Sequence, residues 1–128
     1  MPGRHGWKWQ GVSRRAVRFL EPTILLQLQA GPAHGYTLLE RLREFGLTDL
    51  DPSMLYRSLR DMENDGWATS HWDREQSQGP PRRVYSLTPL GEEVLEAWVK
   101  DLGTTRSMID HLLAAYDRFI SMRQSDHD

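Results

Sequence analysis

The sequence contains no cysteine among its 128 residues. It therefore has no disulfide bond and no thiolate to act as a nucleophile or metal ligand, as is usual in a reducing compartment. It also has no apolar run of about 18 residues, so we predict no membrane span. Residues 1–10 carry cations but no apolar core, which argues against a secretory signal. We expect a cytoplasmic protein that does not bind a membrane.

The sequence also has little net charge, because 16 lysines and arginines are balanced by 18 acidic residues. These charges are unevenly distributed. Residues 1–20 hold five cations and no acid, whereas residues 87–128 hold four cations and eight acids. The phosphates of DNA would orient a protein with a basic front and an acidic rear. The alternative is a solvated surface whose uneven charge has no function.

Residue patterns typical of enzymes and metal sites are missing as well. No two of the five histidines have the i, i+4 spacing of a helical metal site. Gly31 and Gly35 lack the Lys-Ser/Thr continuation of a phosphate-binding loop. Nothing in the sequence places a serine, a histidine and an acid as a catalytic triad. We expect no enzyme activity, no metal and no cofactor.

Helical patterns fill the first third of the chain. Residues 22–30 are largely apolar, and Pro22 suits the first turn of a buried helix. Residues 35–45 carry leucines and a phenylalanine at helical spacing. Gly46 follows them as a favourable residue for the helix end. These patterns predict two helices separated by a short turn.

A third helix and a hairpin follow. Asp51 and Pro52 are a predicted N-cap and first-turn residue, and the helix continues to about residue 65. Two helices, a connector and a third helix form the outline of a helix-turn-helix. Residues 67–72 are aromatic and β-branched, and residues 82–87 alternate between polar and apolar side chains. A polar stretch lies between the two segments. They predict a β-hairpin, which is called a wing when it follows the third helix.

The predicted fold is mainly α with a small β-hairpin, a winged helix-turn-helix with a long C-terminal dimerisation helix. Residues 1–18 are predicted to form a basic N-terminal arm that contains Trp7 and Trp9, and a helix that starts at Ser13 is the alternative for its last residues. Residues 19–88 form the DNA-binding domain. Residues 89–128 form the dimerisation helix and a short tail.

The C-terminal segment begins with Thr88-Pro89, another N-cap and first-turn pair. Its apolar residues recur at seven-residue steps, and an unbroken helix to Met122 would be about 51 Å long. The winged core is too small to cover that length, so we expect a second copy of the chain to cover the exposed seam. Alternatively, the helix breaks at Gly103 and folds back on its own core. The predicted dimerisation residues are Leu95, Leu102, Ile109, Leu112, Tyr116 and Phe119.

The third helix has an apolar face and an opposite face able to bind DNA. Arginine matches guanine, asparagine matches adenine, and hydroxyl groups contact phosphate. Acids near the end of the helix can lie away from phosphate, because recognition helices insert by their N-terminal part. The alternative of a merely solvated face is disfavoured by the position of the helix before a hairpin. The predicted DNA-binding residues here are Ser53, Tyr56, Arg57, Arg60 and Asn64.

Two further groups of cations are candidates for DNA contacts. Arg82 and Arg83 follow a Gly-Pro-Pro segment at the wing and are predicted to anchor on phosphate or the minor groove. Arg14, Arg15 and Arg18 either add phosphate contacts or pair with acids of a partner subunit.

Four segments together resemble the PadR family of bacterial transcription regulators. They are Leu20–Leu26, the His-Gly-Tyr segment Gly31–Leu38, Leu55–Gly66 and the wing exit Gly79–Gly91, in the family's order. The resemblance implies a dimeric winged-helix repressor whose C-terminal helix packs on the partner's N-terminal helix. Tyr56 matches the family's recognition-helix tyrosine, and the two wing arginines match its basic wing.

A single C-terminal helix resembles the short subgroup of this family, in which a lactococcal multidrug regulator stacks flat aromatic drugs between paired tryptophans. Trp98 lies at a comparable place in this sequence. The resemblance implies a planar aromatic effector at Trp98, whereas the alternative is a hydrophobic residue of the helix seam.

The sequence therefore predicts a ligand-responsive repressor that binds a pseudo-palindromic operator on double-stranded DNA as a homodimer, with half-sites about 34 Å apart. One rival is a winged-helix protein-interaction module, which would show no steep salt-dependent affinity for DNA. A second rival is a small-molecule carrier whose DNA binding is vestigial.

Overall fold

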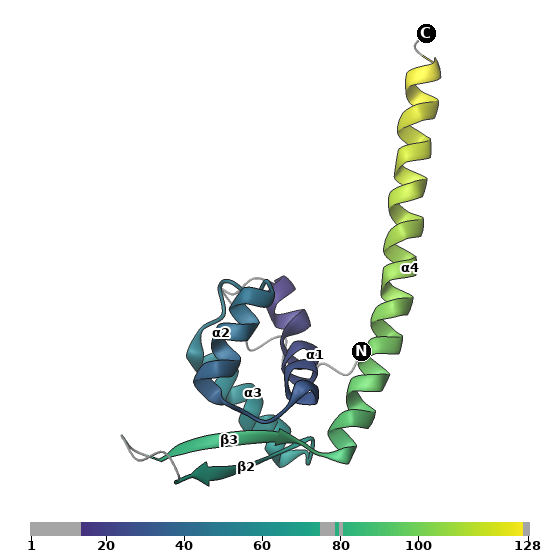
Figure 1. The fold of residues 1–128 in the computed structure, drawn as a ribbon. Coiled ribbons are helices and arrows are strands. Elements are labelled where there is room, and N and C mark those ends of the chain that lie inside the picture. Colours follow the sequence, from purple (N-terminus) through teal and green to yellow (C-terminus); the bar gives the residue numbers. More distant parts are fainter. Residues whose placement is uncertain (1–13, 75–78, 80, 127–128) are drawn as a thin grey trace.

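The computed structural model describes residues 14–74, 79 and 81–126, with side chains from residue 19 onward. Figure 1 shows a small sheet and three helices packed together, with the last helix extending away from them. The predicted fold class is confirmed. The elements are α1 (Arg14–Ala30), β1 (Ala33–His34), α2 (Gly35–Phe45), α3 (Pro52–Asn64), β2 (Ala68–Asp73), β3 (Arg82–Leu87) and α4 (Pro89–Asp126).

The predicted start of α3 is confirmed. Asp51 is its N-cap, and the Asp51 carboxylate accepts hydrogen bonds from the Ser53 backbone N–H at 2.7 Å and the Ser53 hydroxyl at 2.8 Å. These bonds stabilise the ionised carboxylate and lower the pKa of Asp51 below its ordinary value. The cap fixes where α3 begins and therefore which of its residues face outward.

The first helix corrects one prediction. It begins at Arg14, so Pro22 lies in the interior of α1 and not in its first turn. Helix-forming residues upstream of Pro22 extend the helix, although an interior proline costs about 3 kcal/mol or more. The burial of residues such as Leu20, Ile24 and Leu25 in the core offsets that cost.

The sheet is antiparallel, with strand order β1-β3-β2. The two predicted hairpin strands are present, and Trp72 lies opposite Arg83 in their register. The short strand β1 was not predicted, because two residues are too few for a period-2 pattern. Ala33 of β1 pairs with Tyr85, which ties the start of α2 to the wing.

A single hydrophobic core joins α1, α2, α3, the sheet and the beginning of α4. Leu95 and Trp98 of α4 belong to this core, with only 8% and 2% of their surface exposed. Leu95 therefore does not lie on the exposed seam that the heptad pattern predicts. Leu102 also packs against this core, and it is partly buried.

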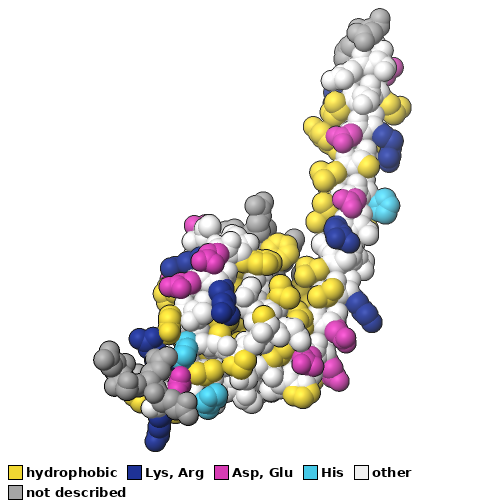
Figure 2. Space-filling view, viewed as in Figure 1, with side chains coloured by type: hydrophobic (Ala, Val, Ile, Leu, Met, Phe, Trp, Pro, Cys, Tyr) yellow, Lys and Arg dark blue, Asp and Glu magenta, His cyan; other side chains and the backbone are white. Residues whose placement is uncertain are grey.

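Beyond the core, α4 continues without interruption to Asp126, so the alternative of a fold-back at Gly103 is not observed. The four remaining seam residues are exposed: Ile109 by 48%, Leu112 by 71%, Tyr116 by 62% and Phe119 by 66%. Figure 2 shows hydrophobic side chains along one edge of this projecting part. None of the helices in the described part of the chain is long and apolar enough to cross a membrane.

Candidate nucleic-acid interface

The outward face of α3 carries all five residues predicted to bind DNA. Ser53, Tyr56, Arg57, Arg60 and Asn64 are exposed, whereas Leu55, Leu59 and Met62 are fully buried on the opposite face. The acids Asp61 and Glu63 are partly buried and lie in the second half of the helix. The first half of α3 therefore presents polar and cationic groups on a helix that the core holds in place.

Tyr56 lies directly against Gly35 at the start of α2. A Cβ atom added to Gly35 would be 2.5 Å from Cε1 and 2.7 Å from the phenol oxygen of Tyr56. Only glycine leaves room for the ring in this position. The His-Gly-Tyr turn thus sets the orientation of the recognition-helix tyrosine, which remains 42% exposed.

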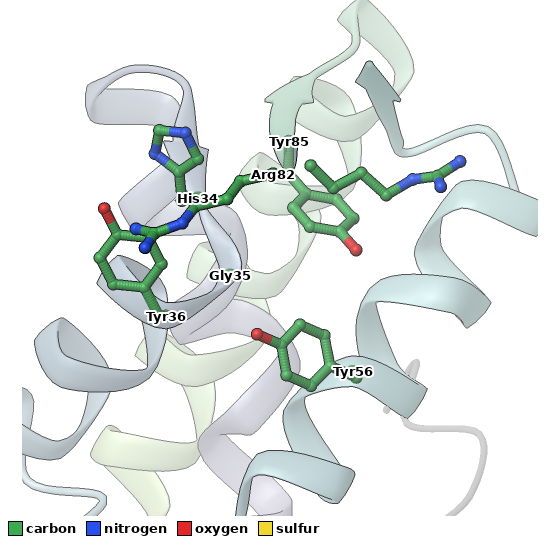
Figure 3. A pocket seen from close by; sticks show the side chains of 7 residues that line it. His34, Gly35, Tyr36, Tyr56, Arg82 and Tyr85 are labelled. Carbon is green, nitrogen blue, oxygen red and sulfur yellow. The ribbon is translucent and has the colours of Figure 1, made fainter. Parts of the chain in front are cut away.

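A hollow of about 280 Å³ opens beside Tyr56, between the start of α2, the helix α3 and the strand β3. Figure 3 shows Tyr36, Tyr56 and Tyr85 around it, with the Arg82 side chain reaching over Tyr36. The Arg82 guanidinium carbon is 4.6 Å from the centre of the Tyr36 ring. The hollow therefore combines phenol groups with a cation, a composition that suits an anion such as phosphate.

His34 connects this hollow to the wing. Its ring stacks on Tyr36 with centroids 5.4 Å apart, and its Nε2 atom is 3.3 Å from a carboxylate oxygen of Asp73 at the end of β2. The distance is that of an ion pair, but the geometry of a hydrogen bond is not met, since Nε2 has no hydrogen-bond partner. The contact is therefore a close approach of the imidazole and the carboxylate without a hydrogen bond. It joins β1 to the outer part of the wing.

Tyr85 lies under the hollow and is 6% exposed. Burial of the phenol and the negative charge of Glu63 raise the pKa of Tyr85 above the ordinary value of a tyrosine. The phenol is therefore protonated at neutral pH. In Figure 3 its hydroxyl group points toward α3.

The two wing arginines make different contacts. Arg82 covers Tyr36, whereas the Arg83 Nε donates to the Ser70 hydroxyl at 2.8 Å. The Ser70 hydroxyl in turn donates to Glu63 of α3 at 2.9 Å. A chain of hydrogen bonds therefore runs from the wing to the recognition helix and holds the two at a fixed separation.

The structure brings the α3 residues and both wing arginines to one surface, which we call the reading surface. His34, Tyr36, Trp72 and Tyr85 also belong to it or support it, and sequence reasoning missed all four. The sequence signals that could have found them were the His-Gly-Tyr segment at residues 34–36 and the alternation along residues 82–87. The side chains of Arg14, Arg15 and Arg18, the two tryptophans of the arm and most of the wing tip lie outside the described residues.

One predicted site residue does not contribute to this surface. Trp98 is 2% exposed in its own core, so its ring is not presented to a planar ligand in the described chain. No group of three or more His, Cys, Asp or Glu residues within 14–74, 79 and 81–126 could hold a metal ion.

A helix-turn-helix core followed by a basic wing defines the class of winged-helix DNA-binding proteins. Within that class, residues 24–97 match the model of the transcriptional regulator PadR-like family. The chain belongs to this family, whose members are transcription regulators and not enzymes. No match is found among the curated proteins.

Solved structures of PadR-like regulators are similar over most of the chain. The regulator from Bacillus cereus ATCC 14579 is 27% identical, with a TM-score of 0.71 over 79% of this chain and 97% of that one. The regulator from Eggerthella lenta DSM 2243 is 29% identical, with a TM-score of 0.69 over 77% of this chain and 85% of that one. The PadR-like transcription factor from Bacteroides fragilis is 31% identical, with a TM-score of 0.65 over 77% and 92%.

Proposed function

We propose that this DNA-binding regulator acts as a homodimeric repressor of a pseudo-palindromic operator. Each copy inserts α3 into the major groove by its N-terminal part, where Tyr56 and, one turn further along the helix, Arg60 contact base edges or phosphate. The observation that carries the proposal is the reading surface, whose polar groups are exposed while the residues behind them are buried. A merely solvated helix face would not need such support from the turn and the wing.

The hollow beside Tyr56 supports the same docking. The guanidinium of Arg82 and the phenols of Tyr36 and Tyr56 surround a space large enough for a phosphate group. A phosphate at this place would fix the register of α3 in the groove without reading sequence. Arg82 therefore anchors the wing side of each half-site.

The exposed part of α4 supports the homodimer. Leu112, Tyr116 and Phe119 are each more than 60% exposed, on a part of α4 that stands away from the other described elements in Figure 1. A second copy of the same helix would cover this seam with a self-complementary surface. Pairing would present two reading surfaces to half-sites about one helical turn apart, roughly 34 Å.

Repression follows from occupancy, because a dimer that covers an operator within a promoter excludes the polymerase. A planar aromatic effector is not part of the proposal, since Trp98 faces the core of its own chain.

Selection of bound duplexes from random DNA, at a stated salt concentration, tests the proposal. A half-palindrome repeated in inverted orientation is the expected result. Arg60→Ala should then weaken binding to the selected operator by about 1–3 kcal/mol if Arg60 reads a base. Arg118→Ala removes the same charge from α4 and serves as the matched control.

The salt dependence separates the two possible roles of Arg60. If Arg60 contacts phosphate, its removal should weaken binding to operator and scrambled DNA equally and reduce the salt slope by about one ion. Failure to select any sequence, with shallow salt dependence, would favour a protein-interaction module and contradict the proposal.

A further inference from the structure

Trp72 is an exposed aromatic residue on the wing that the proposed function does not use. In the β2–β3 register Trp72 lies opposite Arg83, and Ser70 lies opposite Tyr85. Alternate residues of a strand point to the same face, so Trp72 is on the same face of the wing as Ser70. Ser70 contacts Glu63 of α3, which identifies this face as the one turned toward the recognition helix.

Near the base of the wing this face is covered by the helices, as the 2% and 6% exposure of Ala68 and Tyr85 show. Farther out the cover ends, and 51% of Trp72 is exposed. The indole therefore lies on the outer part of the wing face that is turned toward α3 nearer its base. An indole on the opposite face of the wing would point away from α3 and from the DNA proposed to lie against it.

The Trp72 indole is held in place by Arg83. The Arg83 guanidinium carbon is 4.8 Å from the centre of the indole ring, and the Arg83 Nε is fixed by its hydrogen bond to Ser70. Ser70 is itself bonded to Glu63. The indole and the guanidinium are therefore stacked on each other, and hydrogen bonds that begin at Glu63 of α3 fix the orientation of Arg83. Because these two side chains are already ordered, they lose little conformational entropy on binding.

We propose that the Trp72–Arg83 pair packs into the minor groove next to each half-site, with the indole against the deoxyribose wall and the guanidinium toward phosphate. The inference rests on the proposed function, since α3 in the major groove brings the wing to the adjacent minor groove. Two observations favour DNA as the occupant: the pair is continuous with the reading surface, and Arg82 and Arg83 complement phosphate charge. Apolar and cationic side chains are the groups that proteins use in this groove.

The contact would make binding depend on base pairs that α3 does not reach. The minor groove distinguishes A·T from G·C pairs poorly, so Trp72 would respond mainly to the width and flexibility of the flanking DNA. Trp72 is thus a specificity-determining residue that acts through DNA shape.

The test compares two duplexes by fluorescence anisotropy of labelled DNA. One ends at the outer edges of the selected half-sites, and the other continues for about one helical turn on each side. Trp72→Ala in the full chain should weaken binding to the long duplex about tenfold and leave binding to the short duplex unchanged. Phe45→Ala, which removes a 59% exposed aromatic ring from the far end of α2, should bind both duplexes like the wild type.

Two further variants separate DNA contact from a structural role. Trp72→Phe keeps a flat apolar ring and should recover part of the affinity for the long duplex. Arg83→Lys keeps the charge but loses the Nε bond to Ser70, and it should weaken the long duplex preferentially.

The inference is overturned if Trp72→Ala binds the long duplex like the wild type, or if it loses affinity equally on both duplexes. The proposed function fails separately, when Arg60→Ala leaves both duplexes unaffected. A thermal melt of each variant checks that the fold is retained.

Discussion

At the scale of single residues, the reading surface depends on a missing side chain. Gly35 contributes no atom to DNA, yet its hydrogen leaves the space that the Tyr56 ring occupies. A glycine is often required because its backbone must adopt a positive φ. At position 35 it is required because the Tyr56 ring lies too close to leave room for a Cβ atom. The position of Tyr56 on α3 was predictable from helical spacing. Its contact with Gly35 was not, because the rest of α2, a loop and the first turn of α3 separate the two residues along the chain.

Gly35→Ala should therefore weaken DNA binding without unfolding the protein. The added methyl group displaces the tip of the Tyr56 ring, which can rotate because Tyr56 is 42% exposed. We expect a loss of about 1–3 kcal/mol in operator affinity, similar to that of Tyr56→Ala. Gel shifts give the affinity, and thermal melts followed by circular dichroism give the stability.

A double-mutant cycle identifies the route of this effect. If Gly35→Ala acts only through Tyr56, it should cause little further loss in a Tyr56→Ala background. Full additivity of the two losses would show that Gly35 acts independently of the tyrosine ring.

At the scale of elements, local signals set most boundaries. α2 matches its predicted residues, α3 ends one residue early, and Gly46 has the positive φ of 131° expected at a helix end. The start predicted at Pro22 is wrong, because helix-forming residues precede the proline, and α1 begins at Arg14, next to the alternative start at Ser13. The predicted exposed seam of α4 includes Leu95 and Leu102, which instead pack against the core of their own chain. A heptad pattern identifies an apolar stripe but does not tell whether the same chain or a partner covers that stripe.

The junction between the hairpin and α4 offers a test at this scale. A Cβ atom on Gly91 would collide with the backbone carbonyl oxygen of Trp67 and lie 2.5 Å from Leu87 Cδ1. Backbone cannot rotate away as a ring can, so Gly91→Ala should destabilise the fold by about 1–3 kcal/mol. Chemical denaturation measures the change.

Gly103→Ala is the matched control, since it makes the same change in the same helix where nothing lies within 4 Å. It should stabilise α4 by about 0.5–1 kcal/mol, because alanine loses less backbone entropy in a helix. Equal stability of the two variants would show that the contacts around Gly91 are not as tight as described.

At the scale of the whole molecule, the chain divides its surface between two tasks. The reading surface lies at the wing end, and the exposed apolar residues lie along the projecting part of α4 (Figures 1 and 2). The charge of the last helix agrees with this arrangement, since α4 carries seven acids and only four cations. Sequence patterns predicted both regions, but only the structure separates Leu95, inside the core, from Leu112, outside it.

Leu112→Glu should dissociate the proposed dimer and leave the winged domain folded. Leu112 is 71% exposed in the single chain, so a charge there does not disturb the core but would be buried in a paired seam. We expect a monomer in sedimentation equilibrium. Affinity for an operator with two half-sites should fall by about 10²–10⁴, because the two reading surfaces are no longer linked.

Ala114→Glu places the same charge on the same helix away from the heptad positions, and it should remain dimeric with full affinity. A Leu112→Glu chain that stays dimeric would show that copies pair through another surface.

The unbroken α4 also acts as a lever. Leu95 and Trp98 clamp its base to the winged core, and the part beyond Leu102 is about 36 Å long at 1.5 Å per residue. In the proposed dimer the far parts of the two arms are paired, so a change of about 5° in the angle between the arms would move their core ends, and the reading surfaces with them, by about 3 Å. This is close to the 3.4 Å rise of one base pair. The spacing of half-sites that the protein accepts is therefore set by how two stiff rods cross, at a distance from any residue that touches DNA.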